Sequence, residues 1–296
     1  MNRMSTPRSG SRYREARERA FRLDKIASEE APGGVYGKSR RAKGAKIMAS
    51  ASDDNLFTGP IGEEYDFLPF ICPNIVTVTT NLGAAVAAWR PGAALRGLEI
   101  GCGTGTSTRS LLSQRDDLSL RAVDASPAML KQARENLASY ARADRVEFIE
   151  SDALLYLKER PAASVDIVAS NYAIHNFDHR YRRELFAEIL RVLEPGGLFI
   201  NGDRFALDDH DLQLASTQAD VRNMFKVFGE AKRYDLLEDW IVHLFSDESA
   251  DRLMYSSATL STMRALGFAD VRSNYREGVD MLVTATKPSS AARGID

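Results

Sequence analysis

Between residues 95 and 202 the chain alternates short apolar runs with stretches that are apolar at every third or fourth position. The short runs predict buried strands, and the wider spacing predicts amphipathic helices. Such repeated strand–helix units predict a mainly parallel sheet with helices on both faces. The predicted strands are Leu95–Ile100, Leu118–Asp124, Arg145–Glu150, Val165–Ser170 and Leu198–Gly202; the predicted helices are Thr106–Gln114, Pro127–Tyr140, Ala153–Lys158 and Arg182–Leu193.

The flanking segments complete an α/β fold with a three-layer sheet of about seven strands. Pro195–Gly197 is expected to separate the last of these helices from the fifth strand. Residues 205–257 are too long for a bare loop and predict a helical cap. Its predicted packing face is Met224, Phe225, Val227, Phe228, Trp240, Ile241 and Leu244. The other predicted elements are the helices Asn74–Trp89 and Ala258–Leu266, closed by Gly267, and the strands Val271–Tyr275 and Met281–Ala285, the last of which is expected to be antiparallel.

Charge divides the chain at about residue 50, before this pattern begins. Residues 1–50 contain 13 Lys and Arg against 5 Asp and Glu, although the whole chain has 39 against 41. We therefore expect a basic helical and linker extension over residues 1–52, acting as a lid, a contact arm or a loose tail. Residues 53–296 form the predicted main domain, with the insert at 205–257. Its excess of acidic residues argues against a nucleic-acid partner.

The composition excludes several other classes of protein. Cys72 and Cys102 cannot build a disulfide scaffold or a four-ligand zinc site, and the four histidines show no HExxH or similar metal-binding spacing. We therefore expect no metal. No run of 18 apolar residues and no secretory signal occur, so we expect a cytoplasmic protein without membrane contact. The oligomeric state stays open, with a homodimer among the alternatives.

The strongest chemical signal is the glycine-rich stretch LEIGCGTGTST, Leu98–Thr108, which follows a predicted strand and opens a helix. Gly101 and Gly103 allow a tight turn, and the helix that follows directs N–H groups toward a ligand. Asp124 ends the next strand, where a carboxylate can accept two hydrogen bonds from a ribose diol. This arrangement predicts a nucleoside ligand at the carboxyl ends of the strands.

With several later stretches, the loop resembles the Rossmann-like class of S-adenosyl-L-methionine-dependent methyltransferases. The resemblance covers roughly Leu95–Pro288 and implies their fold, cofactor and activity. The matching stretches are LEIGCGTG, VDASPAML (Val123–Leu130), FIESDAL (Phe148–Leu154), VDIVASNYAIHNF (Val165–Phe177), LRVLEPGGLFI (Leu190–Ile200) and GFADV…MLVTATKP near the end.

The resemblance also implies which residues bind the cofactor. For Asp124 and Asp152, helix capping or turn formation is the alternative. The implied contacts are Glu99, Gly101, Gly103 and Gly105 for the methionine part, Asp124 and Ser126 for the ribose, Asp152 and Ala153 for adenine, and Asn171 for the sulfonium end.

Methyl transfer is an in-line displacement, so the protein mainly aligns the two reactants and excludes water. His175 is the candidate general base, and Tyr172 could place its ring against the sulfonium; packing or capping roles stay open for both. Arg204 could bind a carboxylate through two N–H groups. Tyr65 and Phe70 could close the substrate site from the N-terminal side.

The acceptor is expected to be a small molecule under the cap. The fourth strand ends in SNYA and lacks an NPPY or DPPY tetrad, which speaks against methylation of nucleobase or glutamine amino groups. One alternative is a cyclase that forms azetidine-2-carboxylate and methylthioadenosine from the cofactor. A tRNA-modifying transferase and a non-enzymatic regulator are others. Asn55–Gly83 and Phe205–Gly267 give a weaker, architectural resemblance to the carboxymethoxyuridine-forming tRNA enzymes.

Overall fold

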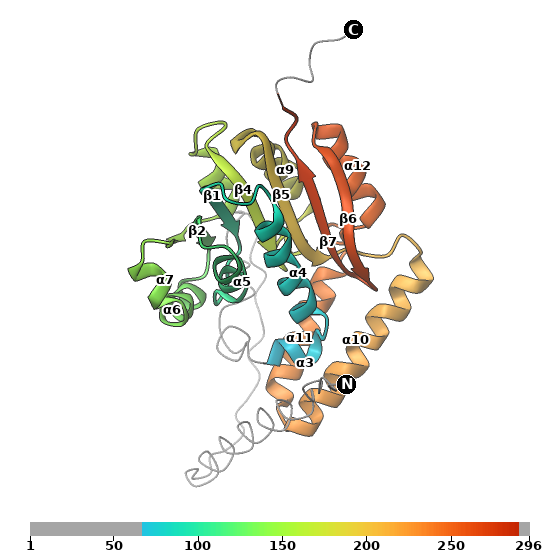
Figure 1. The fold of residues 1–296 in the computed structure, drawn as a ribbon. Coiled ribbons are helices and arrows are strands. Elements are labelled where there is room, and N and C mark those ends of the chain that lie inside the picture. Colours follow the sequence, from blue (N-terminus) through green and yellow to red (C-terminus); the bar gives the residue numbers. More distant parts are fainter. Residues whose placement is uncertain (1–66, 290–296) are drawn as a thin grey trace, which may run out of the picture.

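The computed structural model describes residues 67–289, which form a seven-stranded sheet covered by helices on both faces (Figure 1). The strand order is β3-β2-β1-β4-β5-β7-β6. The first five strands pair in parallel, whereas β7 runs antiparallel to both of its neighbours. The predicted fold class is thus confirmed. The strands are β1 Leu95–Ile100, β2 Leu118–Asp124, β3 Val146–Glu150, β4 Val165–Asn171, β5 Leu193–Arg204, β6 Ala269–Glu277 and β7 Asp280–Thr286.

Each face of the sheet has its own apolar core. Helices α4, α5 and α6 supply Leu82, Leu111 and Leu130 to one core. On the opposite face, α8, α9 and α12 supply Leu157, Ile189 and Met263. The helices are α3 Leu68–Ile71, α4 Ile75–Ala88, α5 Thr106–Gln114, α6 Pro127–Asn136, α7 Ala138–Arg142, α8 Ala153–Lys158, the 3-10 helix η2 Ile174–Asn176, α9 His179–Val192, α10 His210–Ala231, α11 Tyr234–Asp247 and α12 Ser256–Leu266.

Local sequence explains where several of these helices begin and end. The Ser126 hydroxyl accepts a hydrogen bond from the Met129 N–H, and Pro127 occupies the first turn of α6. Asp178 caps α9 in the same way through the N–H of Tyr181. Gly267 ends α12 with a φ of 106°, a conformation that glycine adopts without steric cost.

The continuous helix that we predicted over residues 127–140 is wrong, because Leu137 leaves the helical conformation and separates α6 from α7. Its side chain is fully buried, and one of its methyl groups occupies the space that a Cβ at Gly105 would need. Packing of Leu137 against the glycine-rich loop therefore accompanies the break. This contact joins the loop to the helix that follows β2.

Pro195–Gly197 was expected to lie between a helix and a strand, but it lies inside β5. Gly196 and Gly197 exchange backbone hydrogen bonds with Lys287, so pairing of the chain continues through this segment. The pairing of β5 with β4 shifts register between Val165 and Ile167, and such irregularities accommodate proline.

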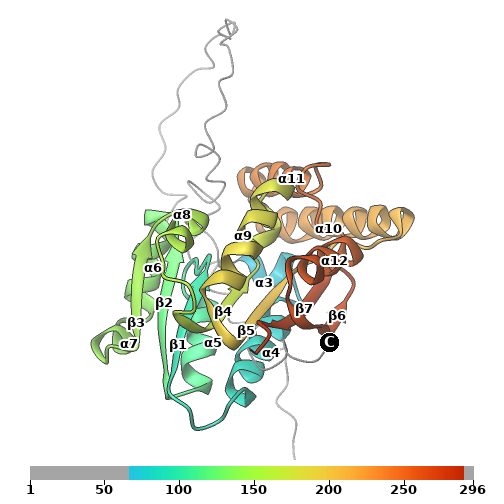
Figure 2. The same cartoon turned by 90° about the horizontal axis from the view of Figure 1, so that it is seen from above.

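The cap predicted over residues 205–257 is helical, and α10 and α11 lie beside α3 at one end of the sheet (Figures 1 and 2). They enclose a third apolar core with α3 and α4, built around Phe228, Trp240 and Val78. The assignment of Phe225 to the packing face is wrong, since the residue is 56% exposed. In the described part of the chain, no helix is long and apolar enough to cross a membrane.

Candidate functional site

The loop after β1 needs glycine at three positions. Gly101, Gly103 and Gly105 all have positive φ angles, of 67°, 52° and 87°. A Cβ at Gly101 would lie 2.3 Å from the Cβ of Ala173, so the loop also lies directly against the segment after β4. Helix α5 begins immediately afterwards at Thr106, as predicted.

Asp124 connects this loop to the end of β2. Its two carboxylate oxygens accept hydrogen bonds from the N–H groups of Gly103 and Ser126, both at 2.8 Å. Burial raises the pKa of Asp124, although these N–H groups favour the ionised form. A carboxylate can accept further hydrogen bonds beyond these two. The turn-forming role is therefore present, and ribose binding stays a prediction.

Glu99 lies on β1 and is 1% exposed. One oxygen accepts a hydrogen bond from the Thr108 hydroxyl at 2.5 Å, whereas the other has no partner within residues 67–289. Burial raises the pKa of Glu99 to about 7. A half-satisfied buried carboxylate is unfavourable by itself, and it fits the ammonium group of the cofactor's methionine part.

Asp152 caps α8 and binds a tyrosine that we did not predict. Its carboxylate accepts hydrogen bonds from the Leu155 N–H at 2.8 Å and from the Tyr181 hydroxyl at 2.7 Å. The same hydroxyl accepts a hydrogen bond from the N–H of Leu154. The capping alternative is thus observed, and the adenine contacts of Asp152 and of Ala153, the first residue of α8, stay predictions. The aromatic residue at the start of the helix after SNYAIHNF was the available signal for Tyr181.

Asn171 and Tyr172 follow one another where β4 ends. Asn171 donates a hydrogen bond to the Thr79 hydroxyl at 2.9 Å, and its own side-chain oxygen has no partner within the described residues. Tyr172 has a φ of 51° and donates a hydrogen bond to Asp280 at 2.7 Å. Burial and Asp280 raise the pKa of this phenol, which therefore stays protonated. Their predicted contacts with the sulfonium stay untested.

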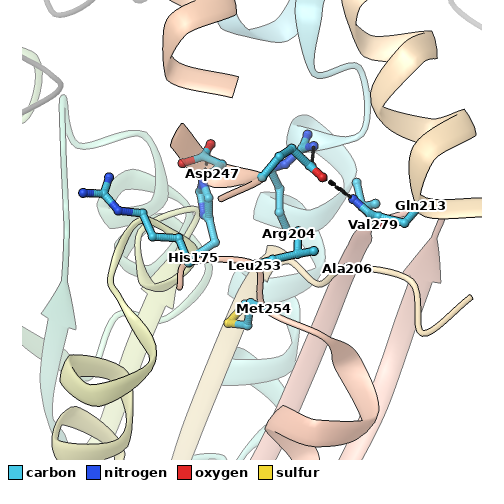
Figure 3. A pocket seen from close by; sticks show the side chains of 10 residues that line it. His175, Arg204, Ala206, Gln213, Asp247, Leu253, Met254 and Val279 are labelled. Atoms are coloured by element: carbon cyan, nitrogen blue, oxygen red, sulfur yellow. Dashed lines mark hydrogen bonds and ion pairs between the residues drawn. The ribbon is translucent and has the colours of Figure 1, made fainter. Parts of the chain in front are cut away.

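His175 lines a cavity next to Asp247 (Figure 3), and its ring lies between the carboxylates of Asp247 and Asp203. Its Nδ1 is 2.5 Å from Asp203, and its Nε2 is 3.6 Å from Asp247. Burial lowers the pKa of His175, but the two carboxylates outweigh burial and raise it to about 9. The imidazole is therefore protonated near neutral pH, and its predicted role as a general base would require loss of that proton.

Arg204, at the end of β5, makes ion pairs with the cap. Its guanidinium is 2.9 Å from Asp220 and 3.8 Å from Glu248. Gln213 donates hydrogen bonds to Glu248, and Figure 3 shows this contact as a dashed line. A substrate carboxylate would have to share this guanidinium with the two protein carboxylates. The adjoining cavity is lined by His175, Arg204, Ala206, Gln213, Asp247, Glu248, Arg252, Leu253, Met254 and Val279.

The two predicted N-terminal contacts differ in what the structure describes. Phe70 belongs to α3, and its carbonyl accepts a hydrogen bond from Asn223 of α10 at 2.9 Å. It is thus attached to the cap, and its contact with a substrate stays a prediction. Tyr65 and the predicted extension over residues 1–52 lie outside the described residues.

The cap also brings a second histidine to the site. Nε2 of His243 is 3.4 Å from Asp247, one turn further along α11, and both side chains are buried. We did not predict either residue. Their spacing of four residues on a helical pattern was the available signal, but His175 joins them only through the tertiary fold.

Comparison with known proteins gives a consistent family assignment for the central part of the chain. Residues 98–197 match the family model described as a methyltransferase domain. A malonyl-[acyl-carrier protein] O-methyltransferase from Paenibacillus sp. (strain JDR-2) is 34% identical over 35% of this chain and 36% of its own length. A carboxy-S-adenosyl-L-methionine synthase from Campylobacter concisus (strain 13826) is 24% identical over 79% of this chain and 99% of its own length.

Solved structures share the fold at low sequence identity. An O-methyltransferase family protein from Burkholderia thailandensis superposes with a TM-score of 0.57 and 20% identity, covering 79% of this chain and 62% of that chain. An S-adenosyl-L-methionine-dependent methyltransferase, described as putative, from Methanococcus maripaludis superposes with a TM-score of 0.54 and 17% identity. The match covers 86% of this chain and 99% of that chain. This chain therefore matches about a third of the length of the Paenibacillus enzyme, but nearly the full length of the Campylobacter and Methanococcus proteins.

Proposed function

We propose that this chain is a class I, Rossmann-like S-adenosyl-L-methionine-dependent methyltransferase and that it methylates a small molecule held beneath its helical cap. One observation carries the proposal. The cavity next to His175 and Arg204 opens at the strand ends that also carry the glycine-rich loop, because β1, β4 and β5 are parallel neighbours. Cofactor and acceptor can thus meet at one edge of the sheet.

The residues of the site suit the two parts of this reaction. When bound, the cofactor supplies an electrophilic methyl group on sulfur. Asp124 holds the ribose hydroxyls, and Glu99 pairs with the ammonium group. The acceptor forms its new bond to the methyl carbon as the carbon–sulfur bond breaks, so alignment and exclusion of water are the main requirements.

The cavity favours a small polar acceptor. Its wall carries both cationic and anionic side chains, such as Arg204 and Glu248. The loop before α10 and the α11–α12 connection complete the wall with Ala206 and Met254. A mixed wall of this kind can orient a molecule that has both hydrogen-bond donors and acceptors.

A second candidate function is cyclisation of S-adenosylmethionine itself. The relatives that align over 80% and 99% of their length are named for making a carboxylated form of this molecule rather than for methylating an acceptor. In the cyclisation, the substrate's deprotonated α-amine forms a bond to Cγ, the Cγ–sulfur bond breaks, and methylthioadenosine leaves. The amine loses one proton overall, and the product is azetidine-2-carboxylate.

Incubation of the full-length protein with methyl-labelled S-adenosylmethionine separates these functions. The first candidate predicts no turnover until a small-molecule acceptor from a panel of amines, phenols and carboxylic acids is added, followed by S-adenosylhomocysteine and a labelled acceptor. Methylthioadenosine and the four-membered ring without an acceptor would establish the cyclase instead. Label in added bulk tRNA would overturn both, and Asp124→Ala serves as the inactive control.

A further inference from the structure

Three metal-ligating side chains from two distant segments meet at the wall of the cavity. His243 and Asp247 lie one turn apart on α11, and His175 comes from η2 after β4. Their ligand atoms all lie within 4.8 Å of one another, and all three residues are buried. They form the one such group of three or more His, Cys, Asp or Glu side chains within residues 67–289.

The distances suit a small cation. Asp247 Oδ2 lies 3.4 Å from His243 Nε2 and 3.6 Å from His175 Nε2. Metal–ligand bonds of about 2.0–2.1 Å at a tetrahedral angle separate neighbouring ligand atoms by roughly 3.4 Å. Both imidazoles thus lie at such a distance from Asp247, and the three ligand atoms lie within 4.8 Å of one another.

Two further observations point to a cation at this position. Asp247 is 7% exposed, yet its Oδ1 has no hydrogen-bond partner among the described residues. Leaving a buried carboxylate oxygen unsatisfied is costly, and a bound ion would remove that cost. In addition, Asp203 binds Nδ1 of His175, which directs Nε2 toward Asp247. Metal-binding histidines usually have such a carboxylate behind them.

We propose that His175, His243 and Asp247 bind a divalent transition-metal ion, Zn²⁺ by their chemistry, at the wall of the cavity. Two imidazoles and one carboxylate are a donor set typical of zinc and neighbouring metals. His175 and Asp247 both line the cavity, so the remaining coordination position faces it. The proposal goes beyond the proposed function and does not depend on it.

The surrounding charges are compatible with an added cation. Binding displaces the proton of His175, and the carboxylates of Asp203 and Asp247 remain to balance the ion. Arg204 is the cationic neighbour on β5, and Asp220 and Glu248 already balance its charge. The ion therefore brings two positive charges where the proton on His175 supplied one, and the carboxylates of Asp203 and Asp247 lie next to it.

Titration of the metal-stripped full-length protein with Co²⁺, and competition with Zn²⁺, tests the proposal. We expect one ion per chain, with the visible absorption bands of Co²⁺ bound by nitrogen and oxygen. His243→Gln and Asp247→Asn should weaken binding by at least about a hundredfold, and Asp203→Asn by roughly ten- to a hundredfold. His210→Gln, at the exposed start of α10, is the matched histidine control and should bind like the wild type.

Failure of the wild-type protein to bind Co²⁺ or Zn²⁺ would overturn the proposal, whatever the variants do. Equal affinity in wild type, His243→Gln and Asp247→Asn would overturn it as well. Circular dichroism in the presence of a chelator establishes that each variant is folded, and Zn²⁺ should raise the melting temperature of the wild type but not that of Asp247→Asn. Because none of these measurements uses turnover, failure here leaves the proposed reaction unaffected.

Discussion

The site has a cofactor half, around Glu99 and Asp124, and a cap half, around His175 and Arg204, and the two halves differ in whether their buried charges are paired. In the cofactor half, Glu99 and Asp124 are held by hydroxyl and N–H donors, and neither has a cationic partner among the described residues. In the cap half, His175 lies between Asp203 and Asp247, and Arg204 lies between Asp220 and Glu248. One half thus keeps uncompensated acids, and the other half neutralises its own charges.

This difference separates binding from stability. An acid without a cationic partner in the protein can pair with the cationic cofactor, so it should affect affinity more than folding. A buried ion-pair network has the opposite effect, because removal of one partner leaves a buried charge unpaired. Substitutions in the two halves should therefore move different measurements.

The largest expected effect belongs to the cap half. Asp203→Asn should lower the free energy of unfolding by about 3–5 kcal/mol, since it leaves the His175 imidazolium without its nearest carboxylate. Urea unfolding measures this loss, with the exposed Asp270→Asn as control. Cofactor affinity should change by less than about threefold; a loss of affinity as large as that of Asp124→Ala would show that the halves are not separate.

Next is Asp124→Ala in the cofactor half. We expect S-adenosylmethionine affinity to fall at least about a hundredfold, equivalent to roughly 2.7 kcal/mol, because both the loop contact and the ribose acceptor are lost. Calorimetric titration measures the change. Asp116→Ala, whose side chain is fully exposed, should retain wild-type affinity. Unchanged binding in Asp124→Ala would contradict the ribose assignment.

Glu99→Gln should stabilise the unliganded protein at pH 8 by about 1–3 kcal/mol. The pKa of Glu99 is about 7 in the folded protein, above its ordinary value of 4.5. The folded state therefore holds the extra proton between these values, and stability falls as pH rises from 4.5 to 7. Urea unfolding should show equal stability of the wild type and Glu99→Gln at pH 4.5, and a more stable variant above pH 7.

The same substitution tests the ammonium contact. With S-adenosylmethionine present, Glu99→Gln should bind about tenfold more weakly at pH 8, since a charge-assisted hydrogen bond becomes a neutral one. Wild-type affinity should fall below pH 7 as the carboxylate gains its proton, whereas the variant's affinity should not follow this titration. Equal affinity at pH 8 would place the ammonium group elsewhere.

Tyr181→Phe should have the smallest effect. The variant loses the hydrogen bond to Asp152 but keeps the ring that packs on Phe177, with 4.4 Å between the ring centroids. We expect cofactor affinity to fall about two- to fivefold and stability to fall by roughly 1 kcal/mol. Tyr234→Phe, on the exposed surface of α11, is the matched control. A loss of a hundredfold or more would indicate that Tyr181 contacts the cofactor directly.

Much of the fold follows from contiguous stretches of sequence. The short apolar runs predicted β1 and β2 with their observed bounds, and they placed Asp124 at the end of β2. The errors arose where distant packing competes with local preference. Leu137 interrupts a helix as it packs against Gly105, and Phe225 is exposed although the local pattern placed it on the packing face.

Local order along the chain therefore determined the sheet, the glycine-rich loop and the cofactor half, because each of these depends on neighbours in sequence and on the regular geometry of parallel strands. Tertiary structure decided the cap half. His175 meets His243 and Asp247 only because α11 packs over the ends of β4 and β5, and that packing depends on side chains such as Trp240 and Phe228. No local spacing records such a contact, since it is set by how two apolar surfaces fit together.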